Sequence, residues 1–173
     1  MRSFLGVLVA LAACRGSDPA PPPAPPAAPQ KEIAVGDRAP SFTEPDLDGR
    51  PTTIVAGKVH VLGFLATWSA PDKQSIPKLE EMYQRHRTKG LVVLAISIDD
   101  EVKYVRSFFQ ENGGTFPVVH DTGHRISSLF HVPCSPTYYV VDQTGVVRFR
   151  HCGYHDGEVA AIEREVETLL SRH

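Results

Sequence analysis

Cysteines and histidines are the side chains of this chain that are best suited to redox or metal chemistry. The sequence has three cysteines, Cys14, Cys134 and Cys152. Five histidines fall between residues 120 and 155, namely His120, His124, His131, His151 and His155. Thiolates exchange with disulfides, and both thiolate and imidazole bind copper and zinc. The second half of the chain therefore offers two chemistries, thiol–disulfide exchange and metal binding.

The spacing of these residues does not favour a metal. None of the intervals matches a standard zinc module, and histidines are common in exposed loops. We therefore predict no metal site and no cofactor. Copper or zinc carriage stays open as an alternative that would use Cys152 and His151.

A third candidate lies where an apolar run meets a helix. Val59 to Ala66 is long enough for one buried strand, and Ser69 is a good N-cap for the helix that follows. Asp72 stands three residues later, so Ser-x-x-Asp reads as a capping-box variant. In that first helical turn a carboxylate gains about 0.3–1 kcal/mol from the helix dipole. Ser69 lacks an obvious base, so we expect a cap here and not a hydrolytic nucleophile.

The elements that would position these residues alternate between strand and helix. Apolar strands are expected at 91–98 and 138–141, and a turn at 142–145 leads into a strand at 146–151. Segment 115–119 contains Pro117, which makes it an edge or irregular strand. Helices are expected from Ser69 to Gly90, around 102–109, at 124–130 and around 159–169. Strands that alternate with helices indicate an α/β domain.

Composition excludes some functions and the N-terminus suggests a location. The chain has 173 residues, 42% apolar, with a formal charge of −2, so we expect one folded domain and no nucleic-acid partner. Residues 1–13 have the form of a signal peptide, and Leu-Ala-Ala-Cys ending at Cys14 resembles the bacterial lipobox. We predict a lipidated Cys14 on a Pro/Ala-rich linker over 14–32, followed by a domain over 33–173. Arg15 favours the outer membrane, on its periplasmic side.

Several motifs together resemble one family. Residues 66–72 read A-T-W-S-A-P-D, and the opening reads G-D-R-A-P-S-F followed by L-D-G. The Asp-Gly pair predicts a turn between two short strands. Later the chain has V-P-C-S-P-T and D-Q-T-G-V-V. These segments are similar to the thioredoxin superfamily, in particular to its membrane-anchored TlpA/ResA-like thiol–disulfide oxidoreductases. The matching residues within the helix-start motif are Ala66, Thr67, Trp68, Pro71 and Pro77.

The resemblance implies a fold, and it also marks a departure. It implies a thioredoxin-like α/β fold, a central mixed β-sheet flanked by helices, with an N-terminal β extension. The family's two catalytic cysteines would stand at Ser69 and Asp72, so this chain lacks the Cys-x-x-Cys pair. Pro136 would be the family's cis-proline and would face the site.

The same resemblance places Cys134 and Cys152 side by side next to the partner-binding groove. In an oxidising compartment two such cysteines are expected to form a disulfide. Three interpretations stay open: a structural disulfide, a redox-active disulfide moved from its usual place, or two free thiols.

These observations predict a lipid-anchored envelope protein without ordinary disulfide reductase activity. We expect it to bind a protein or peptide in a groove between Trp68 and Pro136, or to act in thiol-redox maturation. The alternatives are an oxidoreductase that uses Cys134 and Cys152, and a metal carrier.

Overall fold

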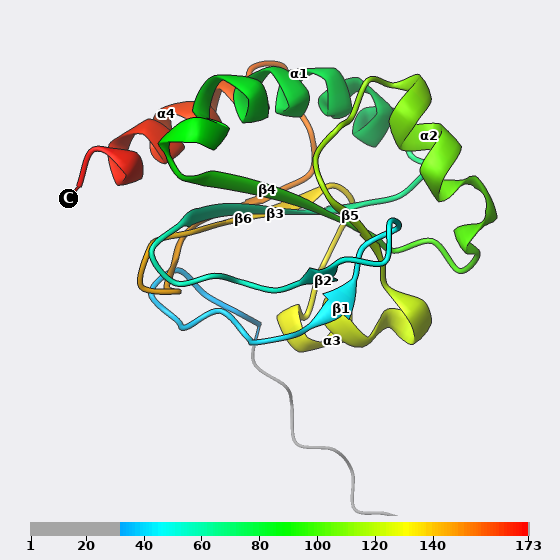
Figure 1. Cartoon of the computed structure of the whole chain (residues 1–173), viewed down its shortest axis with the longest axis horizontal. Helices are drawn as coiled ribbons and strands as arrows, with labels where there is room; N and C mark the ends of the chain where they lie inside the picture. Colours follow the sequence, from blue (N-terminus) through cyan, green and yellow to red (C-terminus); the bar gives the residue numbers. More distant parts are fainter. Residues whose placement is uncertain (1–31, 173) are drawn as a thin grey trace, which may run out of the picture.

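The structure, a computed structural model, describes residues 32–172. They form a mixed β-sheet covered by helices on both faces (Figure 1). The predicted signal peptide, the predicted lipidation site Cys14 and nearly all of the predicted linker lie outside the described residues. Among the helices of 32–172, none is long and apolar enough to cross a membrane.

The central sheet has five strands in the order β5-β4-β3-β6-β7. Strands β3, β4 and β5 run parallel to one another. Strand β6 is antiparallel to β3, and β7 is antiparallel to β6. All seven residues of β3 are buried, as its unbroken apolar pattern predicted. The strands are β3 (Val59–Leu65), β4 (Leu91–Ser97), β5 (Val118–His120), β6 (Thr137–Val141) and β7 (Val147–Cys152).

A two-stranded hairpin precedes the sheet and confirms the expected N-terminal β extension. Strand β1 (Glu44–Pro45) pairs with β2 (Pro51–Thr52) in antiparallel register. Gly49 lies in the turn with a φ of 80°, a value that glycine adopts without steric cost. The hairpin therefore follows directly from the Asp-Gly signal in the sequence.

The sheet divides the core into two layers, with helices on both sides (Figure 1). One cluster packs α1 (Ala70–His86), α2 (Val105–Glu111) and α4 (Glu158–Leu170) against one face of the sheet. A second cluster packs α3 (Arg125–Phe130) and the N-terminal segment against the other face. This arrangement is the thioredoxin-like α/β fold that the sequence predicted.

Some element boundaries differ from the prediction. The helix α1 ends at His86, and a 3-10 turn, η1 (Arg87–Lys89), reaches Gly90, whose φ is 106°. The segment around 102–109 was expected to be one helix, but it begins with a second 3-10 turn, η2 (Val102–Tyr104), which is followed by α2. A third 3-10 turn, η3 (Thr122–His124), precedes α3. The edge strand β5 starts only after Pro117, because proline has no N–H to donate to the ladder.

The carboxyl ends of β3 and β4 lie near the start of α1, at one end of the strands. Binding sites commonly lie at this carboxyl end of parallel strands. The loop before β6 reaches the same place, so the motif residues of the sequence gather there.

Candidate functional site

Helix α1 starts with a capped and largely buried turn. Ser69 is the N-cap, and its Oγ accepts a hydrogen bond from the Asp72 amide N at 3.4 Å. The capping box is incomplete, however, because Ser69 N donates to the carbonyl of Ala66 and not to Asp72. The Ser69 hydroxyl instead donates to Asp72 Oδ1 at 2.8 Å. Asp72 thus uses both hydrogen-bonding roles of this nearly buried hydroxyl, which acts as a cap and is not open to a substrate.

Asp72 is fully buried, which the sequence did not predict. Its Oδ2 accepts from the amide N of Ala66 and from the hydroxyl of Ser135, both at 2.6 Å. Burial raises the pKa of this carboxyl, hydrogen bonds from Ser135, Ala66 and Ser69 oppose that rise, and the charge of nearby Asp99 adds to it. The helix dipole is therefore not the main influence on Asp72, because loss of solvent outweighs it.

Asp99, at the end of β4, fixes the turn that carries Trp68. Its carboxylate accepts from Thr67 N at 3.1 Å, from Thr67 Oγ1 at 2.6 Å and from Ser97 Oγ at 2.7 Å. In the sequence, Asp99 only follows the strand expected at 91–98. The two donors of Thr67 tie the Thr67–Trp68 turn to this buried carboxylate, and the Ser97 hydroxyl ties the carboxylate to β4.

The loop before β6 packs against the start of α1. The Ser135–Pro136 peptide bond is cis, as the family resemblance implies for Pro136. Through its hydroxyl, Ser135 links this loop to the buried Asp72. Ser135 was not singled out in the sequence, where only its position before Pro136 could have drawn attention to it.

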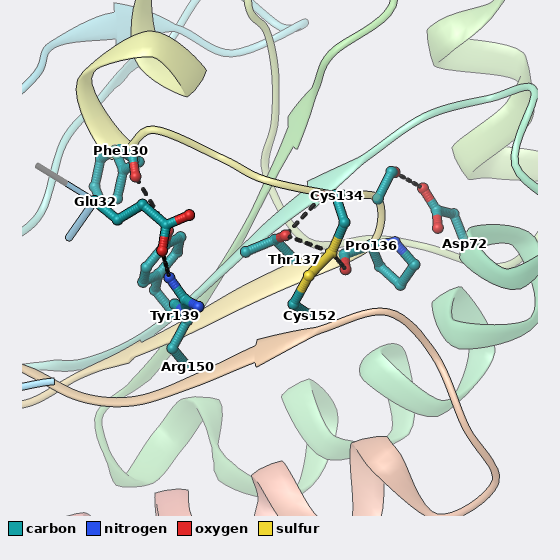
Figure 2. Close-up of a disulfide and its surroundings, with 10 residues drawn as sticks. Glu32, Asp72, Phe130, Cys134, Pro136, Thr137, Tyr139, Arg150 and Cys152 are labelled. Carbon is teal, nitrogen blue, oxygen red and sulfur yellow. Dashed lines mark hydrogen bonds and ion pairs between the residues drawn. A yellow bond between two sulfur atoms is a disulfide. The ribbon is translucent and has the colours of Figure 1, made fainter. Parts of the chain in front are cut away.

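Cys134 and Cys152 are joined by a disulfide that bridges this loop and the end of β7 (Figure 2). Their Cα atoms are 6.0 Å apart, and Thr137 pairs with Cys152 in the sheet register. Cys152 is exposed, whereas Cys134 is half-buried. The disulfide therefore joins a solvent-exposed cysteine, Cys152, to a half-buried cysteine in the loop, Cys134.

A groove of about 300 Å³ lies between Trp68 and this loop. Trp68 is 73% exposed, an unusual exposure for so large an apolar side chain. Pro136 itself is buried, so the residues before it form that wall of the groove. Pro71 is exposed in the first turn of α1 and is not part of the lining. The lining residues are Trp68, Ile98, His124, Ser127, Val132, Pro133, Cys134 and Ser135.

Two of the histidines considered for metal binding, His151 and His155, contact carboxylates. Nδ1 of His151 lies 2.5 Å from Glu158 and its Nε2 lies 2.9 Å from Glu165, while His155 also contacts Glu158. Both ring nitrogens of His151 are therefore occupied, and the two cysteines are bound to each other.

One other group within 32–172 has the composition of a metal site, at the contact of α1 and α4. It contains His86, Glu163 and Glu167. Arg85 already binds Glu163 through two hydrogen bonds of 2.8 Å, which supplies the positive charge a cation would bring. These residues form an ion-pair network that joins the two helices.

Comparison with known proteins shows the family of this chain. Residues 35–150 match the family model described as the AhpC/TSA family. The chain belongs to the AhpC/TSA family. It is 32% identical over 118 residues to the thiol-disulfide oxidoreductase ResA of Geobacillus thermodenitrificans, a match that covers 67% of this chain and 68% of the relative. With ResA of Geobacillus kaustophilus it shares 30% identity over 139 residues, or 79% of each chain.

Solved structures extend the likeness to the whole described fold. A crystal structure from Chlorobium tepidum, assigned as thiol:disulfide interchange protein DsbE, superposes with a TM-score of 0.76 at 27% identity. The match covers 81% of this chain and 100% of that one. The thioredoxin-like fold and the relationship to ResA, both expected from the motifs, are thus confirmed.

Proposed function

We propose that this protein is a polypeptide-binding member of its family that acts in protein binding or thiol-redox maturation in the bacterial cell envelope. The observation that carries the proposal is the 73% exposed Trp68 at the rim of a groove whose other wall is the loop before Pro136. An exposed aromatic beside apolar side chains is a typical anchor for a partner.

The occupant that fits this groove is an extended polypeptide segment with an apolar side chain. Trp68, Ile98, Val132 and Pro133 supply the apolar lining, and the neighbouring serine and histidine side chains supply polar contacts. The relatives are named for thiol–disulfide chemistry. In this chain the start of α1 carries Ser69 and a buried Asp72, which cannot exchange disulfides, so we propose that binding is kept there and ordinary reductase activity is not.

Intrinsic fluorescence of the full chain tests this binding directly, because Trp68 is the one tryptophan in the sequence. The probe is a synthetic tryptophan-free peptide of alternating apolar and polar residues, with serines and no cysteine. Binding is expected to shift the emission to shorter wavelength and to reduce quenching by iodide. An unchanged spectrum at millimolar peptide would contradict the proposal.

A labelled form of the same peptide allows variants to be compared by anisotropy. Removing a central aromatic anchor often costs about 2 kcal/mol or more, so Trp68→Ala should weaken binding by at least about tenfold. Val55→Ala is the control, because Val55 is also an exposed apolar residue, with 49% exposure. It precedes β3, whereas Trp68 follows that strand at its opposite end. Equal losses in both variants would show that the groove is not the binding site.

The envelope location is part of the proposal and rests on the sequence around Cys14. Growth of an expressing bacterium with a labelled fatty acid should label the wild-type protein and not Cys14→Ser. Density-gradient separation of the membranes then tests the outer-membrane assignment. Label in neither protein would remove the lipid anchor from the account.

A further inference from the structure

The Cys134–Cys152 disulfide lies where a bound polypeptide would meet it. Cys134 lines the groove beside Trp68, and the neighbouring Ser135 is tied to Asp72. Cys152 is exposed at the end of β7, which is an edge strand of the sheet. Of the two cysteines, Cys152 is the more exposed residue, which favours its sulfur as the one that a thiolate attacks.

The segments that carry the two cysteines are also joined by backbone hydrogen bonds. The two strands share an antiparallel ladder from Thr137 opposite Cys152 to Val141 opposite Val147. Beyond the ladder, Gly153 N donates to the carbonyl of Pro136 at 2.8 Å. These backbone bonds hold the two cysteine-bearing segments together, so the disulfide can open without separation of the strands.

The surroundings of Cys134 also suit a free thiol. Its Sγ lies 3.4 Å from the carbonyl O of Pro136 and 3.3 Å from Oγ1 of Thr137. A disulfide sulfur has no proton to donate, but a reduced thiol at this place has the Pro136 carbonyl as an acceptor. Thr137 Oγ1, which donates to the Cys134 carbonyl at 2.6 Å, can accept from the thiol as well. The site thus offers hydrogen-bond partners to the reduced form without rearrangement.

We propose that Cys134 and Cys152 form an exchanging disulfide that oxidises a dithiol in the polypeptide bound at the groove. This inference rests on the proposed binding function and adds a reaction to it. It moves the redox chemistry of the domain from the start of α1 to the opposite wall of the groove.

The reaction balances with the polypeptide dithiol as the reductant. A substrate thiolate attacks Cys152 Sγ, the bond between Cys152 and Cys134 breaks, and a mixed disulfide with Cys152 forms. Cys134 leaves as a thiolate and takes up the proton that the first substrate thiol released. The second substrate thiolate then attacks the substrate sulfur of the mixed disulfide and releases Cys152, which takes up the second proton. Two substrate thiols become one disulfide, and one disulfide of this chain becomes two thiols.

The test uses the full chain and a reduced peptide that carries a Cys-x-x-Cys pair in the sequence of the serine probe. After incubation and alkylation, peptide-resolved mass spectrometry reports the state of Cys134 and Cys152 separately from Cys14. We expect one oxidised peptide for each chain whose two cysteines become alkylated, while circular dichroism stays native. Trp68→Ala should slow this transfer at least about tenfold, and the Val55→Ala control should not.

Two variants test which sulfur is attacked. Cys134→Ser leaves Cys152 available and Cys152→Ser leaves Cys134 available for reaction with the disulfide form of the peptide. Mixed disulfide should form at least about tenfold faster in Cys134→Ser. The opposite order would overturn the assignment of Cys152 as the attacked residue.

The serine probe separates the two proposals. If it binds but the dithiol peptide leaves the disulfide of the natively folded chain intact, the exchange proposal is wrong and the binding proposal stands. If the disulfide opens only when the chain unfolds, it is a structural crosslink and the exchange proposal is also wrong. If neither peptide binds, the binding function fails and transfer at the groove fails with it.

Discussion

Replacement of Asp72 separates the two effects of this buried carboxyl, which are hydrogen bonding and burial of charge. Three donors depend on it: Ala66 N, the Ser69 hydroxyl and the Ser135 hydroxyl. Asp72→Ala removes all three acceptor contacts. The serine hydroxyls can rotate, but the Ala66 amide is left buried without its partner. A buried unsatisfied donor costs about 1–3 kcal/mol, so we expect Asp72→Ala to lower the free energy of unfolding by about 2–3 kcal/mol.

Asp72→Asn is the matched control. An amide oxygen in the place of Oδ2 still accepts from Ala66 and Ser135, and the amide nitrogen can donate to Ser69 Oγ. This variant also removes the buried charge. We therefore expect it to change the free energy of unfolding at pH 7 by less than about 1 kcal/mol.

The pH dependence of the same pair has a definite sign. Burial raises the pKa of Asp72, so the folded state keeps this proton at a pH where the unfolded state has lost it. Stability of the wild type relative to Asp72→Asn should therefore fall as the pH rises from the ordinary carboxyl value of 3.8 through the raised pKa, and then level off. Urea unfolding followed by circular dichroism measures both effects. Equal stability of Asp72→Ala and wild type, or a relative stability that rises with pH, would refute the reasoning.

Three further predictions concern other buried or bonded groups. Burial lowers the pKa of His60 from 6.5 to about 4. The free energy of unfolding of the wild type should therefore fall by about 3 kcal/mol relative to that of His60→Gln as the pH falls through that range. The same pH dependence of urea unfolding in both proteins would contradict this. The double variant Ser69→Cys/Asp72→Cys should gain dithiol-dependent insulin reduction at least about tenfold over wild type, with Ser69→Cys alone as the control that lacks the second thiol. Replacing Cys134 and Cys152 by serine opens a loop of sequence separation 18 and should lower the free energy of unfolding by about 3 kcal/mol. The circular dichroism spectrum should stay native; loss of the fold would show that the β6–β7 ladder cannot hold the two strands together without the disulfide.

Local patterns predicted the fold well. The unbroken apolar run of β3, the cap at Ser69, the Asp-Gly turn at Gly49 and the edge position of β5 after Pro117 are all decided within a few residues. Such features follow from burial, capping and turn chemistry, which a sequence displays directly.

The contacts of the candidate site were harder to predict. Asp72 reads as a solvated first-turn carboxylate, because the residue that covers and binds it, Ser135, is 63 positions away. The role of Asp99 depends in the same way on Thr67, 32 positions away. Long-range packing decides whether a carboxylate is exposed or buried, and no local pattern reports it.

Amide hydrogen exchange of the full chain, with and without the serine probe, tests the central claim most directly because it locates the bound polypeptide on the molecule. We expect slower exchange in the turn around Trp68 and in the loop 131–135. We expect no change at the C-terminal end of α4, where Leu170 lies beside Gly90 and Lys58 at the other end of β3. Protection confined to other segments, or none at a concentration that saturates the peptide signal, would contradict the assignment of this groove as a polypeptide-binding site.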